Sequence, residues 1–296
     1  MWVVAGLAVA TRLPSLLSSR HLGFDDGVYG ASALAMRDGE VPFREVFSSQ
    51  GPLFLPLVWV ADLVGFRRHG APRLLGIVAI VALTLAVAAM GTRLRGLRCG
   101  LVAAVMVATS GSVLWVTGPL TSDGIATAFA AVAVAGALSY DAGPSARRAF
   151  VTVLALASAL AVKSLLLPAV IPVAIVLICR RRVAHLALAL GTGLVLALLT
   201  SLPFGIADVW DQSVTYHLDV ADSRTPGANL RKVSSTLGDR DAPLLVGATI
   251  ALGAGAVSAA RARRRGRRGS DDVRQPRVRL RLTGEGLIWV WWASST

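Results

Sequence analysis

Apolar residues recur along the chain in long runs that are separated by short polar segments. A helix needs about 20 apolar residues to cross a bilayer, and most of these runs approach that length. The clearest runs cover residues 2–17, 74–91, 101–117, 125–140, 149–162, 164–178, 184–203 and 243–260. This pattern predicts an all-α polytopic membrane protein with about eight transmembrane helices.

A further apolar run at residues 51–66 is short and carries Pro52 and Asp62. We expect it to lie along the membrane surface. Residues 28–38 have helical spacing of apolar positions and end at an Asp-Gly stop signal. Together, these segments predict two juxtamembrane helices within a first outer loop, residues 18–73.

The positions of the arginines favour one topology. With 51–66 on the surface, the outer loops 18–73 and 204–242 have nearly balanced charge, and the arginine-rich loops fall together on the other side: 92–99, 141–148, 180–182 and 261–268. This is the positive-inside pattern. Treating 51–66 as a span, or merging 149–178 into one kinked helix, would break the segregation. We therefore predict a multi-pass protein of the cell membrane with a cytoplasmic N-terminus.

The composition agrees with this assignment. Hydrophobic residues make up 54% of the 296 residues, and the mean hydropathy is +0.64. The net charge of +13 is accounted for by the cytoplasmic loops and does not indicate nucleic-acid binding. Cys99 and Cys179 are isolated, so we expect reduced structural thiols. We divide the chain into a transmembrane module, residues 1–260, and a basic, irregular cytoplasmic tail, residues 261–296.

Two adjacent acids, Asp25 and Asp26, follow the first apolar run. One of them suffices to cap a helix that begins near Gly27, because a carboxylate accepts hydrogen bonds from unpaired amides there. The other is then a candidate general base or metal ligand. The four histidines show no metal-ligand spacing. We expect no required cofactor, although a divalent cation bridging a carboxylate and a phosphate is compatible with the sequence.

The predicted topology places further polar residues on the same outer face as the acid pair. Asp123 is a candidate site residue or a helix cap, and Lys163 either extends to the surface or binds an anion such as a phosphate. Tyr216 and His217 are suited to binding a sugar, although aromatic residues at this depth also serve as interface anchors. Charged groups that converge on one face at helix ends indicate a functional site.

Six short motifs occur in a characteristic order: Arg12-Leu13-Pro14, Phe24-Asp25-Asp26-Gly27-Val28-Tyr29, Gly39-Glu40-Val41-Pro42-Phe43-Arg44, Gly51-Pro52-Leu53, Leu120-Thr121-Ser122-Asp123 and Ala161-Val162-Lys163. This arrangement, over roughly residues 8–220, resembles polytopic glycosyltransferases of the GT-C type. The nearest branch is that of the protein O-mannosyltransferases and the lipid A aminoarabinose transferases. The resemblance implies transfer of a sugar from a polyprenyl phosphate to an extracytoplasmic acceptor, which is a protein, a glycan or a lipid.

The resemblance also implies roles for individual residues. Asp25 matches the acid that acts as the base on the acceptor, and Asp26 matches the glutamate that follows it, with a shorter reach. Tyr29 and Gln50 belong to the substrate-binding set, with Gln50 at a position where many relatives carry a phosphate-binding lysine. Lys163 is therefore expected to carry more of the contact with the donor phosphate.

Two alternative functions remain open at this stage. Relatives continue with further spans, whereas residues 266–296 resemble neither a helix bundle nor a folded domain, which indicates a truncated or frame-shifted product. A non-catalytic or decayed membrane subunit is thus the main alternative. A lipid or solute transporter is disfavoured because the later apolar runs have almost no polar residues near mid-span.

Overall fold

The computed structural model describes residues 1–17, 23–67, 70–180, 182–221, 231–242 and 245–249, together with residues 227, 253 and 257. The helices are, in order, α1 (Trp2–Ala10), α2 (Leu13–Leu17), α3 (Phe24–Arg37), α4 (Phe54–Val64), η1 (Ala71–Arg73), α5 (Leu74–Arg95), α6 (Leu97–Thr109), α7 (Gly111–Thr117), α8 (Ser122–Ala142), α9 (Ala146–Val162), η2 (Ser164–Ala169), α10 (Val170–Cys179), α11 (Val183–Ser201), α12 (Ile206–Trp210), η3 (Asp211–Thr215, a π-helix) and α13 (Tyr216–Ala221). Residues 231–242 are also helical. The predicted tail, 261–296, and most of the predicted last span, 243–260, lie outside the described residues.

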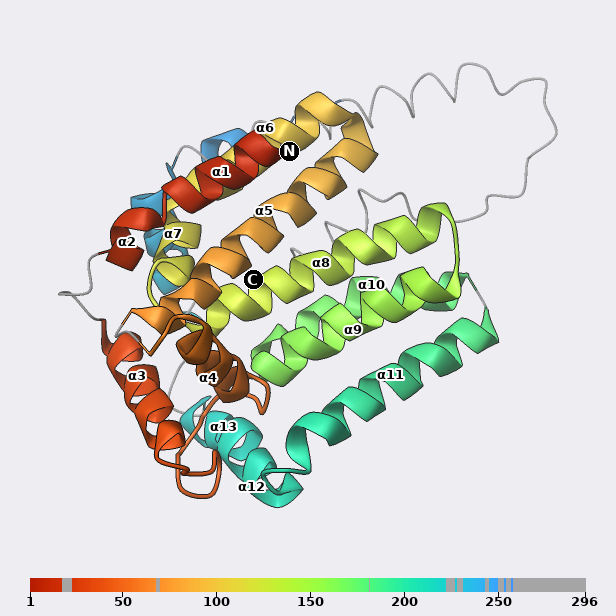
Figure 1. Ribbon diagram of the computed structural model, residues 1–296. Coiled ribbons are helices and arrows are strands. Elements are labelled where there is room, and N and C mark those ends of the chain that lie inside the picture. Colours follow the sequence, from red (N-terminus) through yellow and green to blue (C-terminus); the bar gives the residue numbers. More distant parts are fainter. Residues whose placement is uncertain are drawn as a thin grey trace, which may run out of the picture.

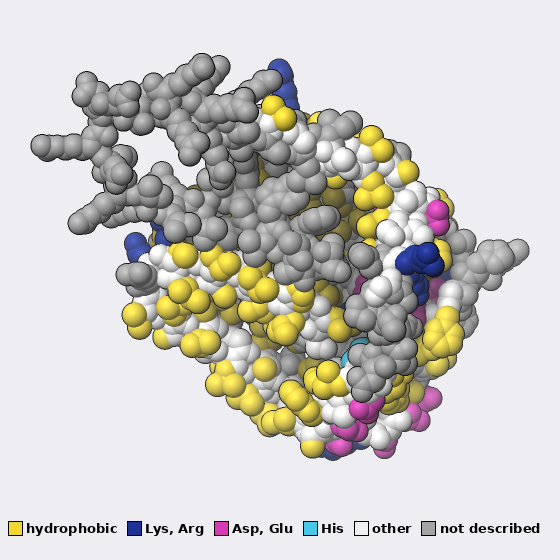
Figure 2. All heavy atoms as spheres, turned by 180° about the vertical axis from the view of Figure 1, so that it is seen from behind, with side chains coloured by type: hydrophobic (Ala, Val, Ile, Leu, Met, Phe, Trp, Pro, Cys, Tyr) yellow, Lys and Arg dark blue, Asp and Glu magenta, His cyan; other side chains and the backbone are white. Residues whose placement is uncertain are grey.

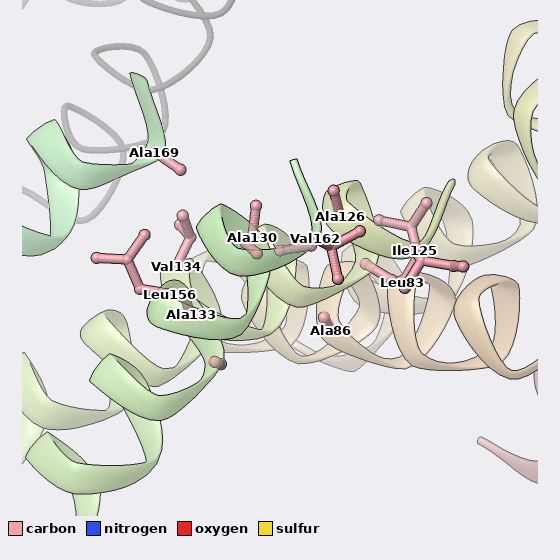
Figure 3. Packing of buried hydrophobic residues seen from close by; sticks show 14 of the residues in the cluster. Leu83, Ala86, Ile125, Ala126, Ala130, Ala133, Val134, Leu156, Val162 and Ala169 are labelled. Atoms are coloured by element: carbon pink, nitrogen blue, oxygen red, sulfur yellow. The ribbon is translucent and has the colours of Figure 1, made fainter. Parts of the chain in front are cut away.

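The centre of the bundle is formed by α5, α8 and α9, with α6 packed on α5 and α11 along the outer side of α9 (Figure 1). Small side chains build these interfaces, and Ala126 and Ala130 of α8 are fully buried. Such residues let helices in a membrane approach closely. Figure 3 shows several larger side chains of the same core, including Leu83, Ile125 and Val162, gathered between α5, α8 and the end of α9.

Three helices among the described residues are long and apolar enough to cross a membrane: Ala71–Arg95, α8 and α11. The pair α6 and α7 meets the same criteria as one span that is bent by 60°. The fold is therefore an all-α polytopic membrane protein, as predicted, with fewer helices of spanning length than the eight apolar runs. The other runs form shorter elements. For example, α1 ends at Ala10, before the buried Arg12, and residues 164–178 are divided between η2 and α10.

Much of the surface is apolar, as expected for contact with lipid. Figure 2 shows hydrophobic side chains spread over a broad area of one face. Only 6% of the most apolar stretch of α11 is buried. Because α11 packs mainly on α9, most of its circumference is left for the bilayer.

The first outer loop contains the two predicted juxtamembrane helices, α3 and α4. The 11-residue α4 is shorter than a bilayer-crossing helix, which needs about 20 residues. Helix α3 buries Asp26 and Ser32, whereas Phe24, Val28 and Leu34 are exposed. The apolar spacing read from the sequence therefore marks the outward face of α3. Such a face suits a helix that lies in the membrane interface.

The two ends of the bundle differ in charge. Arg180 Nε lies 2.8 Å from Asp141 Oδ1, and Arg93 Nη2 donates to Ser139 Oγ at 3.0 Å, so three arginine-rich loops meet at one end. Figure 1 shows the turns that follow α5, α8 and α10 at this end, and α3, α4, α12 and α13 at the other. Helix α9 begins and helix α10 ends at this same end, so residues 149–178 fold back on themselves and do not form one kinked helix. Which end faces the cytoplasm stays a prediction.

Candidate active site

Three charged side chains from distant segments meet at the end of the bundle that carries α3. Lys163 Nζ lies 2.6 Å from Asp123 Oδ1; the Lys163 side chain is 15% exposed and that of Asp123 is 48% exposed. Asp25, in the first turn of α3, is close enough for both charges to act on its carboxylate. The structure therefore brings together Asp25, Asp123 and Lys163, which the sequence had assigned to one face.

Local backbone structure directs Asp123 and Lys163 toward each other. Thr121 caps α8, because its Oγ1 accepts a hydrogen bond from Gly124 N at 3.4 Å. Asp123 is therefore not the residue that caps α8, which was one of the two alternatives that the sequence left open. Helix α9 ends at Val162, and Lys163 has an extended backbone with φ −152° and ψ 113°. This break between α9 and η2 turns the lysine out of the helix and into the site.

The segment that begins at Gly51 is fixed against the end of α9. Gly51 N donates to Val162 O and Leu53 N donates to Ala161 O, each at 2.9 Å. A Cβ atom at Gly51 would lie 2.2 Å from Ala161 O, so only glycine fits there. The two backbone hydrogen bonds place the segment before α4 directly beside Lys163.

Asp26 has an environment quite different from that of Asp25. Its carboxylate accepts hydrogen bonds from Arg73 Nε at 3.0 Å and Arg73 Nη2 at 2.7 Å, and both side chains are nearly fully buried. Leu120 N and Gly23 N also donate to it, at 2.8 and 2.9 Å. Burial alone would raise the pKa of Asp26, but these hydrogen bonds outweigh it and hold the pKa below its usual value. Each oxygen of this carboxylate therefore has two donors.

Asp25, by contrast, is exposed and its pKa is shifted upward. Partial removal of water from its carboxylate raises the pKa, and the negative charge of Asp123 raises it further, while Lys163 lowers it. A carboxylate with a raised pKa is a stronger proton acceptor than an ordinary aspartate. Perturbed acids of this kind are concentrated at functional sites.

A neutral polar network lines the same region. Ser122 Oγ donates to Gln50 Oε1 at 2.7 Å, and Gln50 Nε2 donates to Ser49 Oγ at 3.2 Å. Burial and the charge of Asp25 raise the pKa of Tyr29 to about 12, partly offset by a hydrogen bond with Gln50. The Tyr29 ring also packs edge-on against Phe54, with centroids 4.6 Å apart. Gln50 and Tyr29 thus lie next to the charged cluster and contribute no charge at neutral pH.

The second outer loop approaches the first through Gln212 and an aromatic group. Gln212 Nε2 donates to Phe43 O at 2.7 Å, and its Oε1 accepts from Ser48 N at 3.0 Å. Tyr216 packs edge-on against Phe47 at 5.5 Å and against His217 at 5.7 Å. Tyr216 and His217 therefore lie beside the segment that leads to Gln50.

A cavity of about 400 Å³ adjoins the charged cluster. It lies between α9, α11 and the start of the second outer loop, and Ser164, the residue after Lys163, is part of its wall. Most of the lining is apolar, with a few hydroxyl groups such as Thr200 and Ser213. The charged cluster around Lys163 therefore lies next to an apolar cavity.

Sequence reasoning assigned no role to Arg73 or Ser122. Arg73 had a usable signal, because a lone arginine directly before a 22-residue apolar helix requires a buried partner or water. Ser122 had none, since its partner Gln50 lies 72 residues away along the chain. Within the described residues, no group of three or more His, Cys, Asp or Glu side chains is arranged to hold a metal ion.

These features define a helical membrane protein with a charged cluster at one end of its bundle. ArnT from Cupriavidus metallidurans, whose crystal structure contains undecaprenyl phosphate, has a similar fold with a TM-score of 0.54 and 17% sequence identity. The match covers 76% of this chain and 42% of ArnT, so this chain spans less than half the length of that protein. No protein-family model and no curated protein matches the sequence. The similarity to ArnT is therefore a similarity of fold.

Proposed function

We propose that this protein is a membrane glycosyltransferase that moves a sugar from a polyprenyl phosphate to a hydroxyl group of an extracytoplasmic acceptor. The observation that carries the proposal is the convergence of Asp25, Asp123 and Lys163 at one end of the bundle. This set offers one carboxylate as a proton acceptor and one ammonium group as an anion ligand. The GT-C-like fold and the order of the sequence motifs support the same reaction class.

In the proposed reaction, Asp25 accepts the proton of the acceptor hydroxyl. The acceptor oxygen forms a bond to the anomeric carbon of the sugar, and the bond from that carbon to the phosphate oxygen breaks. The polyprenyl phosphate leaves as an anion and needs no proton. The raised pKa and the exposure of Asp25 suit a base that must meet an incoming acceptor.

Lys163 is assigned to the donor phosphate. Its ammonium group is held by Asp123 and is also within reach of an anion at the exposed side of the pair. The donor phosphodiester carries one negative charge and gains more as its bond to the sugar breaks, so the attraction to Lys163 increases during the reaction. Because Gln50 is neutral, Lys163 supplies the positive charge of the described cluster. We assign Asp123 to holding Lys163 in place before the donor arrives.

The apolar cavity next to Ser164 is assigned to the lipid part of the donor. Its wall includes Ala161, Gly193 and Trp210. This apolar wall suits the first isoprene units of a prenyl chain. The phosphate at the end of that chain would then lie near Lys163. That ArnT was crystallised with undecaprenyl phosphate supports this class of ligand.

Tyr216 and His217 are assigned to the sugar or the acceptor. Tyr216 is 44% exposed, and Phe47 beside it is 58% exposed. Exposed aromatic faces next to a polar cluster suit the apolar faces of a sugar ring. Gln50 and Tyr29 complete the proposed substrate-binding set through their hydrogen bond.

The proposal is tested by incubating membranes that contain the full chain with a panel of labelled polyprenyl-phosphate sugars and with extracts that contain acceptors. We expect transfer of label from one donor above the level in membranes without the protein. If no donor is used although the protein binds undecaprenyl phosphate, the non-catalytic alternative holds. If neither transfer nor binding is observed, the assignment to polyprenyl-phosphate chemistry is wrong.

A further inference from the structure

The ion pair between Asp26 and Arg73 lies beside the candidate active site. We propose that this pair is a positioning clamp that fixes Asp25 relative to Asp123, an inference that rests on the proposed function. Neither member is assigned to contact substrate. Their role is to hold the base and the lysine-bound acid in one arrangement.

The clamp follows from the connections that a single carboxylate makes. Asp26 adjoins Asp25 in the first turn of α3. The same Asp26 Oδ1 atom accepts a hydrogen bond from Leu120 N at 2.8 Å, three residues before Asp123. The starts of α3 and α8, which carry the two acids of the site, are therefore tied through one buried side chain.

Arg73 makes this connection rigid. Two of its nitrogens donate to the two oxygens of Asp26, and its Nη1 donates to Ser15 O at 2.5 Å. Ser15 Oγ in turn donates to Gly118 O at 2.7 Å, on the connection between α7 and α8. A bidentate arginine–carboxylate pair restricts orientation as well as distance. The clamp thus joins the segment before α3, the start of α5 and the start of α8.

The same helix contains a matched pair that does not approach the site. Arg37, in the last turn of α3, donates through Nε to Asp62 Oδ2 at 2.7 Å and through Nη2 to Asp62 Oδ1 at 2.5 Å. Asp62 is as buried as Asp26, and the pair ties α3 to α4. Both pairs stabilise the attachment of α3, but the Arg37–Asp62 pair is at the opposite end of α3 from Asp25.

This comparison gives a test that separates positioning from stability. The variants are Asp26→Asn and Arg73→Lys, with Asp62→Asn and Arg37→Lys as controls, all in the full chain. We expect Asp26→Asn to lower kcat about 100-fold, because a displacement of about 1 Å can have that effect. The Kd for undecaprenyl phosphate, which depends on Lys163, should change less than about twofold. The Arg37 and Asp62 variants should keep kcat within about threefold at equal thermal stability. An equal loss of kcat in the Asp26 and Arg73 variants and in the Asp62 and Arg37 variants would mean that the clamp has only a general structural role.

A second readout does not depend on turnover. Cysteines are introduced by Asp25→Cys and Asp123→Cys after Cys99→Ser and Cys179→Ser, and the rate of cross-linking by a short bis-maleimide is measured. We expect Asp26→Asn to reduce this rate at least about threefold and Asp62→Asn to leave it unchanged. An unchanged rate with Asp26→Asn overturns the clamp. If wild-type protein transfers no sugar but the cross-linking result is as expected, the proposed function fails and the clamp stands.

Discussion

Lys163 Nζ lies 2.6 Å from Asp123 Oδ1, although 40 residues separate them along the chain. The pair forms where α9 stops and α8 starts, so it marks the meeting of two helix ends. Because nearly half of the Asp123 side chain is exposed, the pair is open to exchange with an incoming anion. This relationship underlies the proposed binding of the donor phosphate.

The first prediction concerns Lys163. Lys163→Ala should weaken the binding of undecaprenyl phosphate about 10- to 100-fold, because a hydrogen bond to a charged group contributes about 1.5–3 kcal/mol. The Kd is measured by titration of the purified protein in detergent. Lys163→Arg keeps the charge and serves as the control, with a smaller loss. An unchanged Kd for Lys163→Ala would refute the assignment of the phosphate to this residue.

Gly51 provides the second prediction. Gly51→Ala should reduce both thermal stability and donor binding, because the new Cβ atom would lie 2.2 Å from Ala161 O and push the loop away from the end of α9. Gly191→Ala is the control, since no atom lies within 4 Å of a Cβ there and α11 is helical at that position. Both variants are compared by thermal unfolding and by titration with undecaprenyl phosphate. If Gly51→Ala and Gly191→Ala had similar melting temperatures and similar Kd values, the close contact between Gly51 and Ala161 O would be contradicted.

The third prediction is the effect of pH on stability through Asp25. Its pKa in the folded protein is raised above the ordinary value of 3.8, so the folded state holds the proton more tightly than the unfolded state. The contribution of Asp25 to stability therefore falls as the pH rises from 3.8 through the raised pKa. Asp25→Asn removes this loss and should raise the melting temperature at pH 7, with a smaller gain at pH 4. A lower melting temperature at pH 7 would contradict the sign of the shift.

The orientation in the membrane gives the fourth prediction. Arg180 and Arg93 lie at the same end of the bundle, and the positive-inside rule places this end in the cytoplasm. A reporter enzyme fused after Arg182 should therefore read cytoplasmic. A fusion at Gly39, in the first outer loop, should give the opposite reading and serves as the control. An extracytoplasmic signal after Arg182 would reverse the assigned topology.

The sequence predicted the features that depend on local patterns. Apolar runs identified most of the helices, and the run 51–66 was recognised as short, in agreement with the 11 residues of α4. The arginine pattern separated α9 from α10, and the contact of Arg180 with Asp141 places the end of α10 beside the end of α8. The positions of Asp25 and Lys163 at one end followed from the same pattern.

Other features could not be predicted because they depend on tertiary contacts. The apolar spacing of α3 marks its exposed face, since the polar face is buried by Arg73 and the backbone of Leu120. The residue types alone could not divide the roles of the two adjacent acids, and only the family resemblance assigned the base to Asp25. The hydrogen bonds from Arg73, Leu120 N and Gly23 N distinguish the buried Asp26 from the exposed Asp25.

The central claim is that Asp25 is the base that activates the acceptor. The most direct measurement is the single-turnover rate of sugar transfer by wild-type protein and by Asp25→Asn, at saturating polyprenyl-phosphate donor. We predict a rate at least about 100-fold lower for Asp25→Asn, because general base catalysis contributes roughly 10²–10⁴-fold, with donor binding retained. Transfer by Asp25→Asn at the wild-type rate would contradict the account.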